Sequence, residues 1–350
     1  FRIDGNLVEA MSYDLSIYTA IIARLKIISG MDISEKRKPQ DGRTTLDIDH
    51  VEYDVRVSSL PTVYGEKIVM RLTNKESLTR DKKELGLNDE DMRRFDQMLA
   101  HPHGIILVTG PTGSGKSTTL YTALSELNNE TVNIVTVEDP VEANIDGVNQ
   151  IQVNPKADMT FASALRSILR QDPDIIMIGE IRDPETAEIA VQASITGHLV
   201  ASTLHTNSTS ASIARMLNMG IEPYLIADAL VGVVAQRLVR KLCRCKRGRE
   251  ATPEEKEKLG VGIDEPLTVY DPVGCQLCSQ TGYFGRTAVY EMMPVTPELR
   301  WAITKMQPSS KIKEIAQREG MVTLRGSAVR LVKEGVTSID EMKKIASEED

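Results

Sequence analysis

The segment that most constrains this chain lies at residues 108–119, which read VTGPTGSGKSTT. Residues 110–117 match the spacing G-x-x-x-x-G-K-[S/T] of a phosphate-binding loop. In such a loop, backbone N–H groups close around the phosphates, Lys116 reaches the β- and γ-phosphates, and the Ser117 hydroxyl can ligate Mg²⁺. The sequence therefore predicts a nucleoside-triphosphate site. Its expected binding residues are Gly110, Pro111, Thr112, Gly113, Ser114, Gly115, Lys116, Ser117 and Thr118.

The residues on either side of this loop fit a strand and a helix. Residues 104–109 (GIILVT) are apolar and rich in β-branched side chains, as in a buried parallel strand. Residues 117–127 contain no Pro or Gly, so a helix can begin behind the loop and direct its positive dipole end at the phosphates. The alternative, a glycine-rich turn that binds nothing, is disfavoured because strand, loop and helix are in register.

From residue 103 onward, strand-like and helix-like segments alternate. This rhythm is typical of a parallel, doubly wound sheet in an α/β protein. The expected strands cover 104–109, 132–138, 174–179 and 199–204, and the expected helices cover 116–127, 161–171, 184–195 and 208–218.

The first seventy-odd residues are predicted to form a separate small α/β domain. The expected elements are two short strands around Asp4–Gly5, a helix with apolar residues from Leu15 to Ile28 that is capped by Ser12 and followed by Gly30, a polar loop at 37–43, and strands at 53–58 and 66–72. A charged linker at 73–84 and a helix at 89–99 then lead to the strand before the phosphate loop.

Length and composition limit the number of domains and the classes of partner that we expect. A chain of 350 residues can hold two domains, and a formal charge of −8 with 4% aromatic residues argues against wide, non-specific binding to nucleic acid. No apolar run is long enough to span a bilayer and no signal-peptide pattern is present, so we expect a cytoplasmic protein. Because the chain begins with Phe1 inside an expected strand, we expect an upstream part to be missing.

The expected domains are 1–75, a linker and helix at 76–98, and a nucleotide-binding domain at 99–350, with a tetracysteine region at 241–283 and a helical region at 295–350.

Two acidic side chains follow predicted strands of the sheet. Glu180 ends the segment DIIMIGE, which is typical of a Walker B strand whose acid lies near Mg²⁺ and the attacking water. Glu138 ends the segment VNIVTVE at the same edge. One of these acids is expected to help hold the metal, and the other to orient or deprotonate water. The alternative is that either acid caps a helix or is simply solvated.

Two histidines, His198 and His205, lie at opposite ends of one predicted strand. At a rise of about 3.3 Å per residue they are roughly 20 Å apart, so they cannot share one small ligand unless the strand bends. His205 follows the strand at the edge that carries the phosphate loop, where it can sense the γ-phosphate. The alternative for a lone histidine is a purely structural role.

The four cysteines of the chain form two close pairs, Cys243/Cys245 and Cys275/Cys278. In a cytosolic protein, such pairs indicate a metal site rather than disulfides. Four thiolates suit a closed, tetrahedral Zn²⁺ site. The alternative is a set of reduced, uncoordinated cysteines.

Four motifs together resemble those of the secretion/pilus motor ATPases, and the resemblance covers residues 1–350. The motifs are GPTGSGKST, TVEDPVE, RQDPDIIMIGEIRD and TGHLVASTLHTN, in this order. The chain most resembles the type IV pilus assembly ATPases (PilB-like), with the type II secretion ATPases (GspE-like) nearly as close. Their first cysteine pair is usually C-x-x-C, whereas this chain has the tighter C-x-C.

The resemblance implies a homohexamer of two-domain subunits, with ATP bound between a small PAS-like domain and a RecA-like domain. It places Glu138 at the catalytic acidic position, Glu180 at the Walker B position, and His198 and His205 at the histidine positions. It also implies that Arg56 and Arg71 reach the phosphates from the small domain. Without the resemblance, two strand arginines would be read as surface salt-bridge partners. Further arginines that match positions near the site or the subunit contact are Arg166, Arg170, Arg182 and Arg215.

The resemblance further implies a Mg²⁺-dependent ATPase motor that polymerises pilin or pseudopilin. The expected partners are an inner-membrane platform protein, at which the motor is peripherally associated, and other cytoplasmic components bound through the missing N-terminal region. The cysteines favour assembly or secretion over retraction, because retraction ATPases generally lack them. Two further rivals are a RecA-like nucleic-acid translocase or recombinase, disfavoured by charge, and a nucleotide-binding switch without turnover, disfavoured by the two acids.

Overall fold

The computed structural model describes residues 1–74 and 78–346, and the chain divides into two compact units, Phe1–Leu78 and Thr79–Asp350. Residues 75–77, within the charged linker expected at 73–84, and residues 347–350 of the expected C-terminal helical region lie outside the described residues. Among the described residues, every helix is too short or too polar to cross a lipid bilayer.

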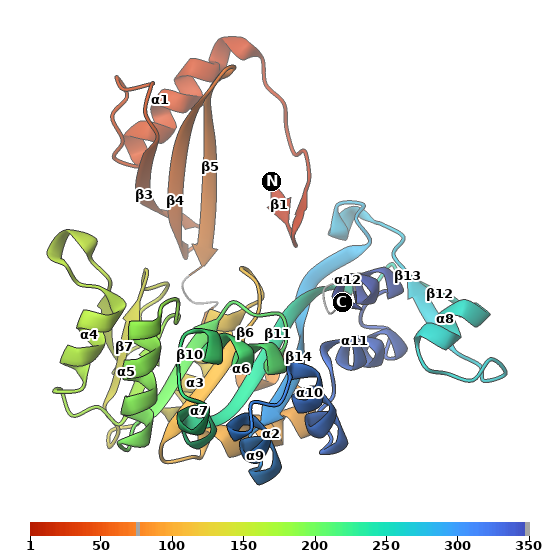
Figure 1. Cartoon of the computed structure of the whole chain (residues 1–350). Coiled ribbons are helices and arrows are strands. Elements are labelled where there is room, and N and C mark those ends of the chain that lie inside the picture. The colour runs from red at the N-terminus through yellow and green to blue at the C-terminus, as the bar shows by residue number, and fades with distance from the viewer. Residues whose placement is uncertain (75–77, 347–350) are drawn as a thin grey trace. The chain divides into compact units, whose positions relative to one another are not determined.

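The first unit joins one helix to a small antiparallel sheet (Figure 1). Its elements are β1 (Arg2–Ile3), β2 (Asn6–Leu7), the 3₁₀ helix η1 (Leu15–Ile17), α1 (Tyr18–Ile28), β3 (Gln40–Ile48), β4 (Val51–Thr62) and β5 (Gly65–Asn74). The sheet order is β3-β4-β5, and β1 and β2 form the expected hairpin around Asp4–Gly5.

Two predictions for this unit are wrong. The helical segment is capped by Asp14, whose carboxylate accepts the backbone N–H of Ser16 at 2.8 Å, and not by Ser12. The segment 37–43 is a loop only up to Pro39, because β3 begins at Gln40 and pairs with β4 along its whole length. This strand is polar because alternate residues stay exposed, so its sequence lacks the apolar run of a buried strand.

Seven strands form the central sheet of the second unit. They are β6 (Gly104–Thr109), β7 (Ile134–Glu138), β8 (Asn149–Gln152), β9 (Ile175–Ile178), β10 (Leu199–Leu204), β11 (Leu230–Leu242) and β14 (Tyr283–Pro294). The order is β14-β11-β6-β10-β9-β7-β8, and all neighbours are parallel except β11 and β14. The predicted parallel sheet is therefore confirmed, with the correction that one edge strand is antiparallel.

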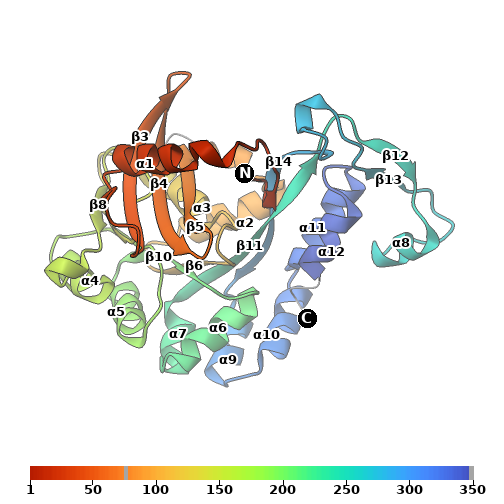
Figure 2. The same cartoon turned by 90° about the horizontal axis from the view of Figure 1, so that it is seen from above.

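Helices cover both faces of this sheet. They include α2 (Asp89–Leu99), α3 (Lys116–Leu127), α4 (Phe161–Ile168), α5 (Pro184–Ile195), α6 (Thr209–Asn218) and α7 (Pro223–Ala229). Figure 2 shows α4 to α7 on the side of the sheet opposite to α3. Alternation along β6 explains this arrangement, because Ile105 and Leu107 enter the main core cluster while the alternate residues Ile106 and Val108 point to the other face.

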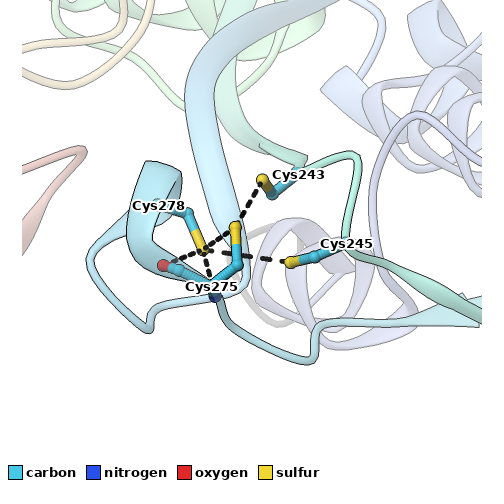
Figure 3. Close-up of side chains that lie close together, drawn as sticks. All are labelled: Cys243, Cys245, Cys275 and Cys278. Atoms are coloured by element: carbon cyan, nitrogen blue, oxygen red, sulfur yellow. Dashed lines mark hydrogen bonds between the residues drawn. The ribbon is translucent and has the colours of Figure 1, made fainter.

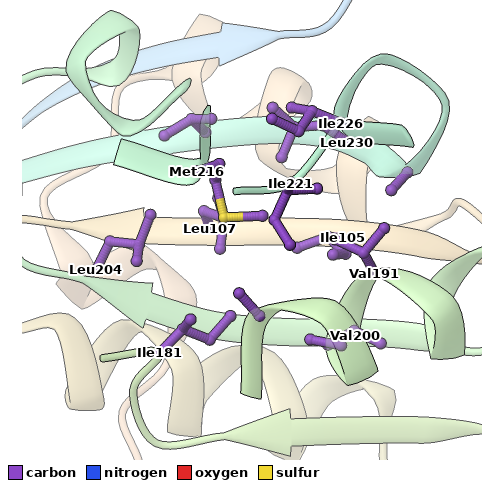
Figure 4. Close-up of a cluster of buried hydrophobic side chains, with 14 of the residues drawn as sticks. Ile105, Leu107, Ile181, Val191, Val200, Leu204, Met216, Ile221, Ile226 and Leu230 are labelled. Carbon is purple, nitrogen blue, oxygen red and sulfur yellow. The ribbon is translucent and has the colours of Figure 1, made fainter. Parts of the chain in front are cut away.

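Figure 4 shows the main core cluster, where Ile105 and Leu107 of β6 and Val200 of β10 meet apolar side chains of the covering helices. Every residue of β6 and β10 is buried. Such two-sided burial favours apolar strands, which is the pattern of residues 104–108, while in β10 the buried hydroxyls of Ser202 and Thr203 donate to the carbonyl oxygens of Ile178 and Gly179. This packing fixes the strand ends that carry the phosphate loop and His205.

The remaining elements of the second unit lie before β6, between β8 and α4, between β11 and β14 around the cysteines, and after β14. These elements are the 3₁₀ helices η3 (Lys82–Leu85), η4 (Pro155–Ala157) and η5 (Gln276–Cys278), the hairpin strands β12 (Arg247–Glu250) and β13 (Thr268–Asp271), and the helices α8 (Pro253–Lys258), α9 (Pro297–Thr304), α10 (Ser309–Arg318), α11 (Leu324–Lys333) and α12 (Ile339–Ala346).

Candidate functional site

The phosphate loop joins β6 to α3, as its sequence predicts. Gly115 caps α3 with φ of 90°, in the left-handed region that favours glycine. A Cβ at Gly115 would lie 2.8 Å from Nε2 of Gln236, and one at Gly110 would lie 2.5 Å from the Gln236 carbonyl oxygen. Both glycines are therefore required by the close approach of β11 as well as by the turn itself.

Lys116 and Ser114 point polar groups into the loop. The Lys116 Nζ donates to the carbonyl oxygens of Gly110 at 2.9 Å and Pro111 at 3.1 Å. Burial lowers the pKa of Lys116, the positive charge of Arg237 lowers it further, and the negative charge of Glu180 opposes both. The Ser114 hydroxyl is buried and has no hydrogen-bond partner among the described residues. The loop thus offers a cation and an unused hydroxyl, whereas Ser117 is exposed at the start of α3.

Glu180 lies two residues beyond β9, at the edge of the sheet that carries the loop. Its side chain is 13% exposed, and its carboxylate contacts Arg182 and, at 3.1 Å, Nε2 of His205. Burial works to raise the pKa of Glu180, but the hydrogen bonds from Arg182 and His205, together with the positive charge of Arg182, outweigh burial and hold the pKa below its usual range. The structure therefore joins His205 to the predicted Walker B acid.

Glu138 is the last residue of β7, and its side chain is nearly completely buried. Its Oε1 accepts hydrogen bonds from Thr136 Oγ1 at 2.7 Å and Gln150 Nε2 at 3.1 Å. Its Oε2 accepts a hydrogen bond from the Tyr121 hydroxyl. Glu138 is therefore neither a solvated acid nor a helix cap, because three side chains of the chain hold its carboxylate.

His198 lies at the opposite end of β10 from His205. It precedes Leu199, which pairs with Gly104 at the start of β6, while Leu204 pairs with Thr109 next to the loop. The His198 Nδ1 lies 2.8 Å from the Ala193 carbonyl oxygen, and its own carbonyl accepts the Gly104 N–H at 3.1 Å. The structure thus brings His205, and not His198, to the phosphate-loop edge of this subunit.

In the first unit, Arg56 of β4 and Arg71 of β5 are direct partners across the sheet, and Arg43 of β3 is paired with Arg56 on the other side. The three arginines line one hollow of about 650 Å³ on the sheet. The buried carboxylate of Asp54 contacts Arg43 Nε at 2.5 Å and Arg56 Nε at 3.6 Å. This row is a concentrated positive surface, and Asp54 orients two of its guanidinium groups.

The other arginines that the sequence singles out lie on the second unit. Arg166 of α4 forms an ion pair with Glu185 of α5 at 2.6 Å. Arg170 donates to the Arg166 carbonyl oxygen at 2.8 Å, so these contacts of both arginines are with residues of α4 and α5. Arg215 donates to the carbonyl oxygen of Arg182 at 3.4 Å, which ties α6 to the segment after Glu180.

Sequence reasoning missed the polar residues that β11 brings to the loop. Gln236 accepts a hydrogen bond from Thr119 Oγ1 at 2.8 Å, and Arg237 donates to the Asn207 carbonyl oxygen at 3.2 Å. Both residues are buried within a strand that is otherwise apolar up to that point. A buried polar pair inside an apolar run is the signal that could have identified them.

The four cysteine sulfurs lie within 4.8 Å of one another, and Figure 3 shows them gathered in one cluster. The Sγ–Sγ distances are 3.8 Å for Cys243–Cys275, 3.9 Å for Cys245–Cys278 and 3.7 Å for Cys275–Cys278. Four thiolates at about 2.3 Å from a tetrahedral Zn²⁺ are about 3.8 Å apart, so the cluster fits this ion. The C-x-C spacing of the first pair therefore does not prevent all four sulfurs from meeting.

Backbone N–H groups support the thiolate form of Cys278. Its Sγ accepts hydrogen bonds from the backbone N–H groups of Cys275 at 3.1 Å and Gly282 at 3.3 Å. Burial works to raise the pKa of Cys278, but these N–H groups and the neighbouring thiols lower it to about 6. A thiolate near neutral pH is the form that binds metal.

The parallel sheet, the loop and the acids at its edge define a P-loop nucleotide-binding α/β protein. A family model described as "Type II/IV secretion system protein" matches residues 1–344. The chain therefore belongs to this family, and the resemblance of its four motifs to secretion/pilus ATPases is confirmed.

Relatives from both branches of the family match along almost the whole chain. The type II secretion system protein E of Aeromonas hydrophila is 48% identical over 350 residues, which is 100% of this chain and 70% of that protein. The type IV pilus assembly ATPase PilB of Myxococcus xanthus is 48% identical over 347 residues, which is 98% of this chain and 61% of that protein. The pilus retraction motor PilT, solved with bound ADP, superimposes with a TM-score of 0.63 and 27% identity over 87% of this chain and 77% of that chain.

Proposed function

We propose that this chain is a Mg²⁺-dependent ATPase motor that powers the polymerisation of pilin-like subunits, in type II secretion or in type IV pilus assembly. The observation that carries the proposal is the 48% identity, along the whole chain, to relatives named as a type II secretion system ATPase and a pilus assembly ATPase. The phosphate loop with two acids beside it supports a hydrolytic function rather than a passive nucleotide switch.

The residues of the loop and the acid beside it have separate roles in binding the phosphates and Mg²⁺ in this proposal. Backbone N–H groups of residues 110–118 and the Lys116 ammonium hold the phosphates, and the unpartnered Ser114 hydroxyl is available to donate to them. Ser117 and Glu180 are the residues that would hold Mg²⁺, and the ion would neutralise charge on the phosphate oxygens. His205 contacts Glu180, so it couples the γ-phosphate side of the site to that acid. We assign no phosphate contact in this loop to His198.

Glu138 orients and deprotonates the attacking water in this proposal. A buried carboxylate held by three side chains is fixed in place, which suits a positioned base. Hydrolysis is direct: the water oxygen forms a bond to the γ-phosphorus, the bond to the β-phosphate oxygen breaks, and Glu138 takes the proton. Arg56 and Arg71 stabilise charge on the transferred group, since guanidinium groups bind phosphate oxygens in a fixed planar geometry.

The assembly that we propose is a homohexamer of RecA-like subunits at the inner membrane. It acts on a platform protein together with further components of the machinery. The four cysteines would hold a structural Zn²⁺, which would tie the segment after β11 to the segment before β14. This cluster favours assembly or secretion over retraction. Relatives named for secretion and for pilus assembly match at equal identity, so the two systems stand as equal candidates.

The test is ATP hydrolysis across a series of protein concentrations, with the mass in each sample measured by light scattering. Specific activity that rises as hexamers form supports a ring in which acids and arginines act together. Full specific activity in a sample that is entirely monomeric would overturn the ring motor. Lys116→Ala is the control, because it removes the only ammonium group that the loop sequence supplies.

A further inference from the structure

Tyr121 connects the helix behind the phosphate loop to the acidic segment after β7. It lies on α3, five residues beyond Lys116, and its side chain is fully buried. Its hydroxyl donates to Oε2 of Glu138 and accepts the backbone N–H of Glu142 at 3.1 Å. One hydroxyl therefore joins three elements: the loop helix, the carboxylate at the end of β7, and the chain that follows it.

The two oxygens of Glu138 are held by different parts of the fold. Oε1 is held by Thr136 of β7 itself and Gln150 of the neighbouring β8. Gln150 also donates to the Ala143 carbonyl oxygen at 3.0 Å and accepts the Ile145 N–H at 2.7 Å, so it anchors the same segment. Among the described residues, Tyr121 is the one donor to Oε2 and the one side chain that links Glu138 to α3.

The chemistry of the phenol suits a permanent donor. Burial raises the pKa of Tyr121 above its ordinary value, and the adjacent charge of Glu138 raises it further. Tyr121 therefore keeps its proton throughout the pH range in which the protein works, and its hydroxyl always has a hydrogen to give to the carboxylate. A donor that is fully buried and hydrogen-bonded on both sides also fixes the direction in which the remaining carboxylate lone pairs point.

We propose that Tyr121 is a positioning residue for hydrolysis: it fixes the carboxylate of Glu138 relative to the phosphate loop through α3, the helix that the loop itself begins. This inference rests on the proposed role of Glu138 as the acid that orients water. It adds a residue whose effect is on turnover and not on nucleotide affinity, because Tyr121 contacts the acid and has no exposed surface toward the loop.

The first experiment compares Tyr121→Phe with the matched control Tyr290→Phe. Tyr290 is equally buried in the same unit, and its hydroxyl donates to the Leu85 carbonyl oxygen at 2.9 Å. We expect Tyr121→Phe to lower kcat roughly 10- to 100-fold, as for loss of a hydrogen bond to a charged group, with the Kd for ATP within twofold of wild type. Tyr290→Phe is expected to keep kcat within twofold while losing a similar amount of thermal stability.

The second experiment repeats Tyr121→Phe in a Glu138→Gln background, using single-turnover assays at high enzyme concentration. If Tyr121 acts through Glu138, the second substitution changes the residual rate less than twofold. An equal fall in both backgrounds, or a fall in kcat matched by Tyr290→Phe, assigns Tyr121 a structural role and overturns the inference. Strong loss in Glu138→Gln with no loss in Tyr121→Phe also overturns it, yet leaves the proposed function intact. Wild-type turnover in Glu138→Gln would instead refute the role of the acid itself.

Discussion

Replacing Cys245 tests the metal site at the cysteine pair with the tight C-x-C spacing. Its Sγ lies 3.9 Å from that of Cys278, and all four sulfurs lie within 4.8 Å of one another. In Cys245→Ser, the hydroxyl occupies the same place but has no tendency to ionise near neutral pH. The site then keeps three thiolates and loses one.

The size of the effect follows from the geometry. A structural Zn²⁺ bound by four ligands contributes about 10–16 kcal/mol in isolated peptides, which is about 2.5–4 kcal/mol for each equivalent ligand. The sulfurs lie at tetrahedral separations already, so little of this is lost to rearrangement. Cys245→Ser should therefore weaken Zn²⁺ binding by roughly 10²- to 10³-fold.

The assay is competition for Zn²⁺ against a coloured chelator, with metal content measured by mass spectrometry. Wild type should carry one Zn²⁺ per chain and Cys245→Ser should lose it to the chelator. Arg244→Ser is the matched control, since it lies between the two cysteines on the exposed side and should bind as wild type does. Equal affinity in wild type and Cys245→Ser would refute a four-thiolate site.

Three further predictions concern Arg56, the glycines of the phosphate loop, and the ion pair between Arg249 of β12 and Glu255 of α8. Arg56→Lys should lower kcat at least about 100-fold with little change in ATP affinity, because an ammonium cannot reproduce the planar guanidinium contact; turnover within threefold of wild type would contradict this. Gly115→Ala should lower the free energy of unfolding in urea about 1–2 kcal/mol more than Gly113→Ala, because both have positive φ but only the first meets Gln236, and equal losses would contradict that reasoning. Hydrogen bonds from Arg249 lower the pKa of Glu255 from 4.5 to about 2, so this pair stabilises the fold above pH 4.5 and the contribution is lost as pH falls toward 2. The stability difference between wild type and Glu255→Gln, about 1 kcal/mol at neutral pH for a pair near the surface, should vanish across that window, and a constant difference would count against the pair.

The sequence was informative where one pattern had one structural solution. The strands 104–109 and 199–204 and the helices 116–127 and 184–195 have the predicted bounds, because two-sided burial and a phosphate loop leave little freedom. The helix predicted at 161–171 ends earlier, at Ile168, where the next residue caps it. Local periodicity alone did not set that end.

The parts that sequence reasoning missed depend on partners far along the chain. β8 is a short polar edge strand, and β11 and β14 carry buried polar residues such as Gln236 and Glu291 that interrupt an apolar pattern. Their pairing only becomes favourable inside the completed sheet. The contacts of Tyr121 and Gln150 with Glu138 were missed for the same reason, because no short spacing links residues on α3, β7 and β8.

The most direct test of the central claim is the turnover of Glu138→Gln beside its binding of ATP. The substitution keeps the shape of a side chain held by Thr136, Gln150 and Tyr121 but removes the proton acceptor. We predict that steady-state hydrolysis falls at least about 100-fold while the Kd for ATP stays within a few-fold of wild type. Hydrolysis at the wild-type rate would contradict the account, because the acid at the end of β7 would then have no part in the reaction.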